Sequence, residues 1–234
     1  MFKYVIEPYS QPITDCNTGC IIGFEILLKV TKETPIKNYL SPDSLLHTFK
    51  STIEYNHLTI CLMHHVNERI EELTEKLPDN GFISFNIIAE QLLSASFVKY
   101  LISFRKKIRQ DIKLVLELVD NNRSSLTDDI INTISTLSKH NIEIAIDDFS
   151  NNSISIKYIE AMRFYMLKLG RELSLTHNNT LIYESTIKSL VYLTSLVNTI
   201  LVVEGVETKL QKDLLLNCGV NYMQGYYFGA PTSM

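Results

Sequence analysis

Short apolar runs alternate with longer amphipathic segments along most of the chain. The runs cover residues 21–28, 82–86, 112–118, 142–147, 164–169 and 199–204, and each has the length of a buried strand. Apolar residues recur with helical spacing between them, at residues 41–55, 61–77, 125–140, 179–197 and 206–219. We therefore predict buried strands separated by helices, with Ser41 and Pro42 starting the first helix and Gly219 ending the last.

Near-continuous hydrophobic strands that alternate with helices are typical of a parallel sheet covered on both faces. At 234 residues, the candidate folds are a (β/α) barrel and an open doubly wound sheet. No glycine-rich phosphate loop follows the first strand, and no linker, repeat or low-complexity segment divides the chain. We therefore expect one α/β domain over residues 1–234.

Charge and composition argue against several classes of protein. The net charge is −4 and the basic residues cluster only at 105–107, which disfavours binding to duplex nucleic acid. No stretch approaches the roughly twenty apolar residues of a membrane helix, and the N-terminus lacks the apolar region of a signal peptide. The four cysteines lack a second ligand pair at zinc spacing and are expected to be free thiols. We expect a cytoplasmic protein without a membrane partner.

Polar residues stand at the ends of five of these apolar runs. They are Asn86, Glu117, Asp147 with Asp148 after it, Lys168 and Glu204. A further acid, Glu25, lies inside the first run. In a (β/α) barrel the carboxyl ends of the strands converge on one mouth, so these groups would share an acidic cavity. Neighbouring carboxylates stay ionised only when positive charge neutralises them, and oxygen ligands without Cys or His favour Mg²⁺ or Mn²⁺.

Other interpretations of these residues remain open. Polar residues can simply mark where strands reach solvent, although this explains poorly why most of them are acids. Lys168 could form a Schiff base as in aldolases, but the neighbouring carboxylates would keep its amine protonated. One or two divalent cations between Asp147 and Asp148 would instead suit hydrolysis of a phosphodiester, with Lys168 supplying positive charge near the phosphate.

Eight motifs, in order along the chain, carry a resemblance to a known family. They are QPI (11–13), EIL (25–27), FNIIAEQL (85–92), LELVD (116–120), IAIDDF (144–149), LKL (167–169), VVEGVET (202–208) and QGYYF (224–228). Together they resemble the EAL domain, the bacterial cyclic-di-GMP phosphodiesterase module, over residues 11–231. The resemblance implies a modified TIM (β/α)8 barrel with one reversed strand. It also implies hydrolysis of cyclic-di-GMP to the linear dinucleotide pGpG with one or two Mg²⁺ or Mn²⁺ ions, inhibition by Ca²⁺, and room for a homodimer.

The resemblance also implies roles for single residues. The expected metal ligands are Glu25, Asn86, Glu117, Asp147, Asp148 and Glu204, with Asp148 serving a second ion. The expected catalytic residues are Glu25, Lys168, Glu204 and Asp148, with Lys168 contacting the nucleophilic water. The expected substrate-binding or supporting residues are Gln11, Leu27, Lys29, Glu207, Gln224 and Pro231. Tyr226 and the aromatic residues around it are expected to serve packing rather than guanine stacking.

The chain departs from the family pattern at four places. Lys29 replaces an arginine that would grip phosphate through two parallel donors, which predicts weaker substrate binding. Asp120 stands where the family has a longer acid, and Gly170 replaces an aspartate that often ends the lysine motif. Residues 150–155, SNNSIS, lack both glycines of the family's Gly-Thr-Gly-Tyr-Ser-Ser, and asparagine reaches positive φ less readily than glycine.

These departures leave three functional hypotheses. The first is a metal-dependent phosphodiesterase with reduced activity, which the retained strand-end acids favour. The second is a receptor that holds cyclic-di-GMP without cutting it, which the altered loop and Lys29 favour. The third is a protein-interaction module that has lost the nucleotide, although such drift should have eroded the acids.

Overall fold

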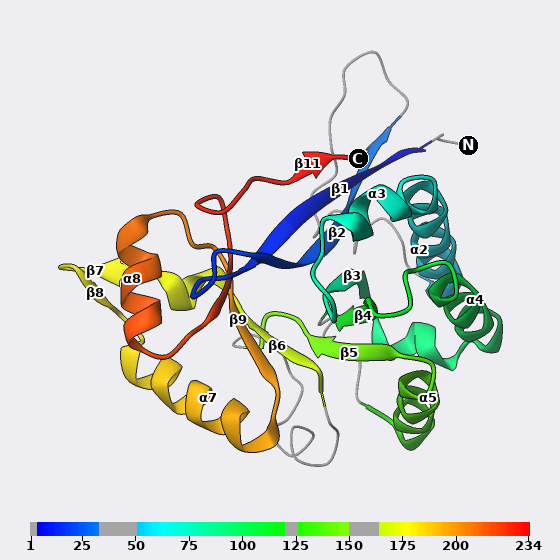
Figure 1. The fold of residues 1–234 in the computed structure, drawn as a ribbon. Coiled ribbons are helices and arrows are strands. Elements are labelled where there is room, and N and C mark those ends of the chain that lie inside the picture. The colour runs from blue at the N-terminus through cyan, green and yellow to red at the C-terminus, as the bar shows by residue number, and fades with distance from the viewer. Residues whose placement is uncertain (1–3, 33–50, 120–125, 150–163) are drawn as a thin grey trace.

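A barrel closed by its own first strand forms the centre of the molecule (Figure 1). The computed structural model describes residues 4–32, 51–119, 126–149 and 164–234. Within these residues the barrel strands are β1 (Tyr4–Asp15), β2 (Ile21–Lys32), β3 (Phe82–Ile87), β4 (Lys113–Leu118), β5 (Ile142–Ile146), β6 (Met166–Leu169), β9 (Ile200–Val203) and β10 (Tyr222–Gln224). Pairing of β1 with β10, with Ile13 opposite Gln224, closes the ring.

The reversed strand of the barrel is β1. It runs antiparallel to both of its barrel neighbours, β2 and β10, whereas every other neighbouring pair in the ring is parallel. The expected α/β barrel with one reversed strand is therefore confirmed, and the open doubly wound sheet is excluded. A short strand, β11 (Thr232–Ser233), pairs with β1, and β7 (Thr176–His177) and β8 (Thr180–Leu181) form a small separate hairpin.

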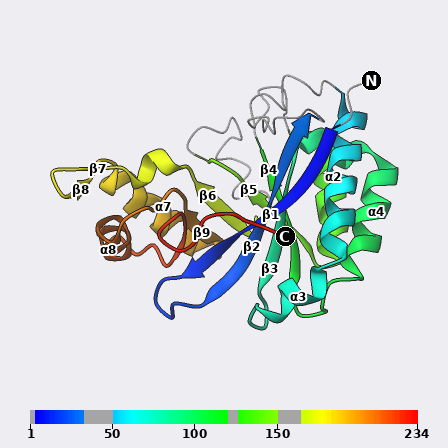
Figure 2. The same ribbon diagram turned by 90° about the horizontal axis from the view of Figure 1, so that it is seen from above.

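Helices pack around the barrel (Figure 2). α2 and α4 lie side by side on one flank, and α7 and α8 lie side by side on the opposite flank in both views. The bounds are α2 (Thr52–Asn67), α3 (Ile70–Glu75), α4 (Ala95–Arg105), α5 (Asp128–Ser138), α7 (Glu184–Val197) and α8 (Lys209–Asn217), with 3-10 turns η1 (Ala89–Leu93) and η2 (Arg171–Ser174). Among the helices described, none is long and apolar enough to cross a membrane.

The sequence pattern located most of these elements and missed some. The predicted helix start at Ser41 and Pro42 lies outside the described residues, and α2 is capped by Ser51, whose hydroxyl accepts from the Glu54 amide. Gly219 follows α8 with a φ of +91°, which confirms it as the residue that ends the helix. The pattern predicted neither α4 nor the strands β1 and β10.

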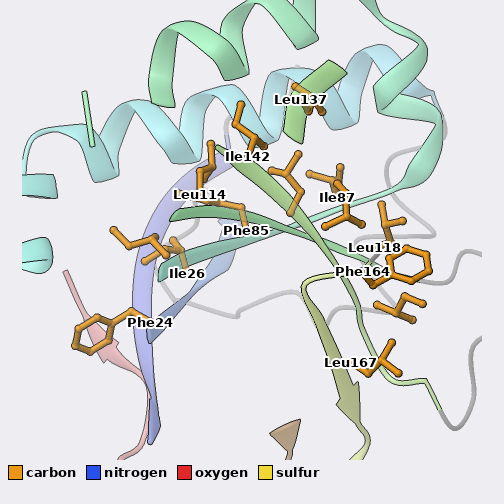
Figure 3. Packing of buried hydrophobic residues seen from close by; sticks show 14 of the residues in the cluster. Phe24, Ile26, Phe85, Ile87, Leu114, Leu118, Leu137, Ile142, Phe164 and Leu167 are labelled. Atoms are coloured by element: carbon orange, nitrogen blue, oxygen red, sulfur yellow. The ribbon is translucent and has the colours of Figure 1, made fainter. Parts of the chain in front are cut away.

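Two apolar clusters hold the fold together. The larger one lies between the outer face of the barrel and the helices, where Phe85, Leu114 and Ile142 pack beneath Leu137 of α5 (Figure 3). The smaller one fills the barrel interior and consists of Ile13, Phe82, Val115, Ala145, Met166 and Val202. These six residues come from six different strands, so the interior is a packed plug that supports whatever lies above it.

Candidate functional site

The interior of the barrel is layered, with a polar layer above the apolar plug. Alternate residues of a strand face the same side, so the residue two positions after an interior one is also interior. Val115 belongs to the plug, and Glu117 follows it by two positions. On the reversed strand β1 the order is inverted, so Gln11 precedes Ile13. The polar layer consists of Gln11, Glu25, Ser84, Asn86, Glu117, Asp147, Lys168, Glu204 and Gln224.

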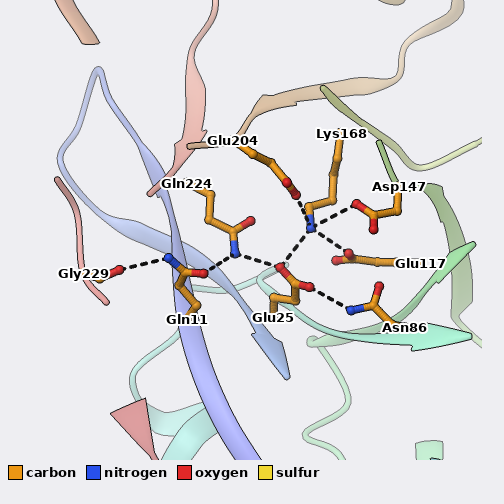
Figure 4. A network of polar contacts seen from close by, with 9 residues as sticks. All are labelled: Gln11, Glu25, Asn86, Glu117, Asp147, Lys168, Glu204, Gln224 and Gly229. Carbon is orange, nitrogen blue, oxygen red and sulfur yellow. Dashed lines mark hydrogen bonds and ion pairs between the residues drawn. The ribbon is translucent and has the colours of Figure 1, made fainter. Parts of the chain in front are cut away.

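The ammonium group of Lys168 is the centre of this layer (Figure 4). The Lys168 side chain is 1% exposed, and its Nζ lies 2.9 Å from Glu25 Oε2 and 2.7 Å from Glu117 Oε2. Two more carboxylates reach the same nitrogen, with Asp147 Oδ1 at 3.5 Å and Glu204 Oε1 at 2.5 Å. The structure therefore brings together acids from β2, from β4 and from the residues that follow β5 and β9.

One ammonium cannot neutralise four carboxylates. Burial alone would lower the pKa of Lys168, but the surrounding carboxylates, Glu117 first among them, outweigh burial and raise this pKa well above its usual value. Burial raises the pKa of Glu117 well above its usual value, raises the pKa of Asp147, and raises that of Glu204 to about 7. The cluster therefore favours the charged form of the lysine, and the excess acids need further positive charge to stay ionised.

Glu25 is the acid that the site holds most firmly in its ionised form. It accepts hydrogen bonds from Asn86 Nδ2 and Gln224 Nε2, each at 2.8 Å, in addition to the Lys168 contact. Burial would raise the pKa of Glu25, but the charge of Lys168 and these hydrogen bonds outweigh burial and lower it. The Asn86 and Gln224 amides therefore orient a carboxylate that stays charged at neutral pH.

A chain of amides connects this cluster to the reversed strand. Gln224 Nε2 also donates to Gln11 Oε1 at 3.2 Å, and Gln11 Nε2 donates to the Gly229 carbonyl at 3.1 Å. Gln11 lies on β1 and Gln224 on β10, so these contacts depend on the closure of the barrel. The reversed strand thus contributes directly to the site.

Several buried oxygens in this layer meet no hydrogen-bond donor among the described residues: Asn86 Oδ1, Glu117 Oε1, Gln224 Oε1 and Ser84 Oγ. Buried acceptors without a partner are costly unless a cation or a water meets them. Within the described residues no three acids, histidines or cysteines already surround a common metal position, because the carboxylates converge on Lys168 instead. The donors are all oxygen, which suits a hard divalent cation.

Asp148 lies beside this cluster, in a backbone conformation with a φ of +44°. A Cβ built on Gly170 would come within 2.3 Å of Asp148 Oδ1 and 2.7 Å of both Glu172 carboxylate oxygens. The absence of a side chain at residue 170 therefore makes room for two neighbouring acids. Two further departures from the family, Asp120 and the segment 150–155, lie outside the described residues.

A cavity of about 290 Å³ adjoins the Lys168 cluster. Of the residues predicted from the sequence, it is lined by Gln11, Glu25, Leu27, Asp147, Glu204, Glu207 and Gln224. Arg171 and Tyr226 also line it, and the sequence reasoning gave a site role to neither. Tyr226 is 68% exposed, so packing does not account for it. In the sequence, only their positions indicate a site role. Arg171 lies two residues after the motif LKL (167–169), and Tyr226 lies within QGYYF (224–228).

A second, more apolar hollow of about 330 Å³ adjoins the first. It shares Glu25, Leu27 and Asp147 with the cavity and is otherwise walled mainly by apolar side chains of β2, β3 and α2. Asn86, which contacts Glu25, also lines this hollow. The site therefore offers a charged compartment and an apolar compartment side by side.

Lys29 and Pro231, both predicted to bind substrate, line neither hollow within the described part of the chain. The Lys29 Nζ lies 3.7 Å from the centroid of the Tyr9 ring, where the ring face attracts its charge. Pro231 is half-buried immediately before β11. Their roles in substrate binding stay predictions.

Comparison with known proteins agrees with the family resemblance that the motifs indicate. PdeL of Escherichia coli K12, described as a cyclic di-GMP phosphodiesterase, is 30% identical over 230 residues, which are 98% of this chain and 63% of PdeL. The chain thus spans less than two thirds of the length of that relative. Among solved structures, the PaMucR phosphodiesterase in its c-di-GMP complex superposes with a TM-score of 0.79 at 21% identity, covering 97% of both chains.

Bacillus subtilis YkuI, solved with c-di-GMP and calcium, also superposes with a TM-score of 0.79 at 21% identity, covering 98% of this chain and 56% of YkuI. At this identity, both superpositions establish the fold. The family model described as the EAL domain matches residues 5–231. Because this match runs through nearly the whole sequence, the chain belongs to the EAL domain family.

Proposed function

We propose that the chain is a metal-dependent phosphodiesterase that hydrolyses cyclic-di-GMP to the linear dinucleotide in the cytoplasm. The observation that carries this proposal is the buried cluster of four carboxylates around Lys168, bordered by buried oxygens without donors. Such a cluster has no structural rationale in an apolar barrel, because an uncompensated buried charge is destabilising. The description of PdeL as a cyclic di-GMP phosphodiesterase supports the choice of substrate.

The donor set fits Mg²⁺ or Mn²⁺. Glu25, Asn86, Glu117, Asp147 and Glu204 would hold one ion, and Asp148 would serve a second. The unpaired Asn86 Oδ1 and Glu117 Oε1 support this assignment, since both are buried oxygen acceptors. A bound ion would neutralise the acids, polarise the scissile phosphate and lower the pKa of water. Ca²⁺ should occupy the site and inhibit, because it tolerates longer, irregular coordination.

Lys168 supplies fixed positive charge to the reaction. The neighbouring carboxylates outweigh burial and raise the pKa of Lys168, which favours the ammonium form and argues against a Schiff base. Held by Glu25 and Glu117 in the interior of the site, its Nζ would donate to the nucleophilic water rather than to the phosphate. Water adds across one phosphodiester linkage, and the opened linkage leaves a phosphate on one nucleoside and a hydroxyl on the other.

The two hollows suit the two chemical parts of a cyclic dinucleotide. The charged cavity presents the amides of Gln11 and Gln224 near Glu25, where a phosphate and ribose would lie. The apolar hollow beyond Leu27 has walls of the kind that bury a base. This pairing favours a nucleotide over a small phosphate ester.

The first test is hydrolysis of cyclic-di-GMP by the purified chain with Mg²⁺ or Mn²⁺, measured as linear dinucleotide formed. We expect turnover that Glu25→Ala abolishes, because the alanine removes a metal ligand and the partner of Lys168. Glu72→Ala is the matched control, since Glu72 is an exposed acid in surface ion pairs. Calorimetry with Mn²⁺ alone should show binding to the wild type that Glu25→Ala weakens.

The outcomes separate the three hypotheses. Tight binding of cyclic-di-GMP without turnover would make the protein a receptor. Neither binding nor turnover at micromolar nucleotide would leave only a protein-interaction role. Turnover unchanged by Glu25→Ala would overturn the site assignment.

A further inference from the structure

Arg171 stands out among the residues that line the charged cavity. It follows Gly170 and begins η2, three positions after Lys168. The other charged side chains that line this cavity, within the described residues, are carboxylates: Glu25, Asp147, Glu204 and Glu207. The Arg171 side chain is exposed, and no ion pair of the described residues involves its guanidinium. Its donors are therefore available to a ligand.

The fold holds the backbone of Arg171 against the loop around Gly205, which also lines the cavity. Gly205 has a φ of +66°, and a Cβ built there would lie 2.2 Å from the Cβ of Arg171. Any larger residue at 205 would push the two segments apart. Glycine at this position therefore sets the close approach of Arg171 to the loop that carries Glu204 and Glu207.

Hydrogen bonds tie the same two segments together. Ser174 Oγ donates to the Arg171 carbonyl at 2.8 Å and can also donate to the Gly205 carbonyl at 3.1 Å. The buried Gln211 donates from Nε2 to the Ser174 carbonyl at 3.0 Å, and its Oε1 accepts from the Glu207 amide at 2.9 Å. These hydrogen bonds fix the backbone of Arg171 to the loop that carries Glu207. The backbone position therefore does not depend on contacts of the Arg171 side chain.

Besides the proposed metal ions, a cation at the rim of the cavity would favour the entry of a phosphodiester. Its negative charge must enter a cavity rimmed by carboxylates, which would repel it. Lys168 is 1% exposed and already contacts four acids, so it is committed to the interior of the site. Lys29, which replaces the family's phosphate-gripping arginine, lies over the Tyr9 ring and does not line the cavity.

We propose that the guanidinium of Arg171 binds a phosphate of the substrate. This contact would compensate for the weaker phosphate binding that is expected of Lys29. This inference rests on the proposed function, because it takes the ligand of the cavity to be a phosphodiester. The fork of an arginine matches two phosphate oxygens, whereas an ammonium offers a single point of charge. Arg171 is a substrate-binding residue, and Gly205, Ser174 and Gln211 are positioning residues.

The test compares Arg171→Ala, Arg171→Lys and wild type for cyclic-di-GMP. KM and kcat are measured with Mg²⁺, and the Kd is measured separately with Ca²⁺ present. We expect Arg171→Ala to raise KM and Kd by about 10- to 100-fold, the range for one lost charged hydrogen-bonded pair, with kcat changed much less. Arg171→Lys should recover part of this loss, and more at low salt, since a point charge is screened more readily.

Controls separate this effect from loss of the fold or of the function. Alanine keeps the Cβ that packs on Gly205, so the thermal midpoint should stay within about 2 °C of wild type. Lys188→Ala removes an exposed lysine paired with Glu184 on α7 and should leave both constants unchanged. Lys29→Ala should raise the Kd less than Arg171→Ala does.

Each result decides the proposal. Wild-type binding with a KM and Kd unchanged in Arg171→Ala would overturn the role of Arg171 and leave the proposed function intact. A fall in kcat alone would also overturn it, because a binding residue acts on KM and Kd. Failure of the wild type to bind cyclic-di-GMP would overturn the proposed function and, with it, the inference.

Discussion

Gly170 is a departure from the family pattern that the local geometry explains. The sequence shows only that an aspartate is missing two residues after Lys168. In the structure, the space a side chain would fill is occupied by the carboxylate of Asp148 and by that of Glu172. Two neighbouring carboxylates therefore lie where a side chain at position 170 would be.

We therefore predict that Gly170→Asp fails to raise activity and weakens the site. The new Cβ would lie 2.3 Å from Asp148 Oδ1, and a third carboxylate would add like-charge repulsion. Calorimetric titration with Mn²⁺ should give a Kd at least about 10-fold weaker than wild type, as expected for a displaced ligand. Gly170→Ala separates crowding from charge, and a tighter Mn²⁺ Kd in Gly170→Asp would contradict this account.

At the scale of elements, the polar layer depends on the plug beneath it. Gly23 precedes Glu25 by two positions on β2, and a Cβ at residue 23 would lie 2.4 Å from the Phe82 ring. The Phe82 ring therefore fills the space that any other residue at position 23 would need. This packing keeps β2, and with it Glu25, at its distance from β3.

Gly23→Ala should destabilise the barrel by about 1–3 kcal/mol, the usual cost of overpacking a filled core. The free energy of unfolding in urea measures this change. Combining it with Phe82→Leu removes part of the ring that the new methyl group meets. The double variant should therefore be more stable than the sum of the two single effects, and strict additivity would contradict direct contact.

Several elements were predictable from the sequence, and others were not. The strands β2, β3, β4, β5, β6 and β9 fall on the apolar runs, because a strand buried on both faces must be apolar nearly throughout. β1 contains Pro8 and Pro12 among polar residues, so its pattern does not resemble a buried strand. The short β10 and the helix α4 were missed as well, although Ser94 is a clear N-cap for α4.

At the scale of the whole molecule, the charge of the site should make the stability depend on pH and on the proposed metal. Burial raises the pKa of Glu204 from 4.5 to about 7 and raises those of Glu117 and Asp147. These groups bind protons more tightly in the folded state than in the unfolded state. Their protonation therefore stabilises the fold fully below about pH 4.5, and this stabilisation is lost as the pH rises through 7. Glu25 has a lowered pKa in the folded state, so its titration changes the stability only below about pH 4.5, outside this range.

The chelator-treated protein should therefore lose stability between about pH 5.5 and pH 8, by an amount on the order of 1–3 kcal/mol. Mn²⁺ should raise the thermal midpoint more at pH 8 than at pH 6, since cation and protons compete for the same acids. Glu204→Gln removes one titrating group and should flatten the profile. A midpoint of the metal-free wild type that rises with pH over this range would contradict this electrostatic account.

The sequence by itself determined which residues are apolar, where most strands and helices lie, and which polar groups end the strands. Those properties follow from local periodicity, which a strand or helix expresses wherever it is placed. Only the tertiary structure decided that Glu25, Glu117 and Glu204 meet on one lysine. It also decided that the Lys29 ammonium lies over Tyr9 while Arg171 lines the cavity. These contacts join residues far apart in the chain and depend on how the barrel closes, which no local pattern encodes.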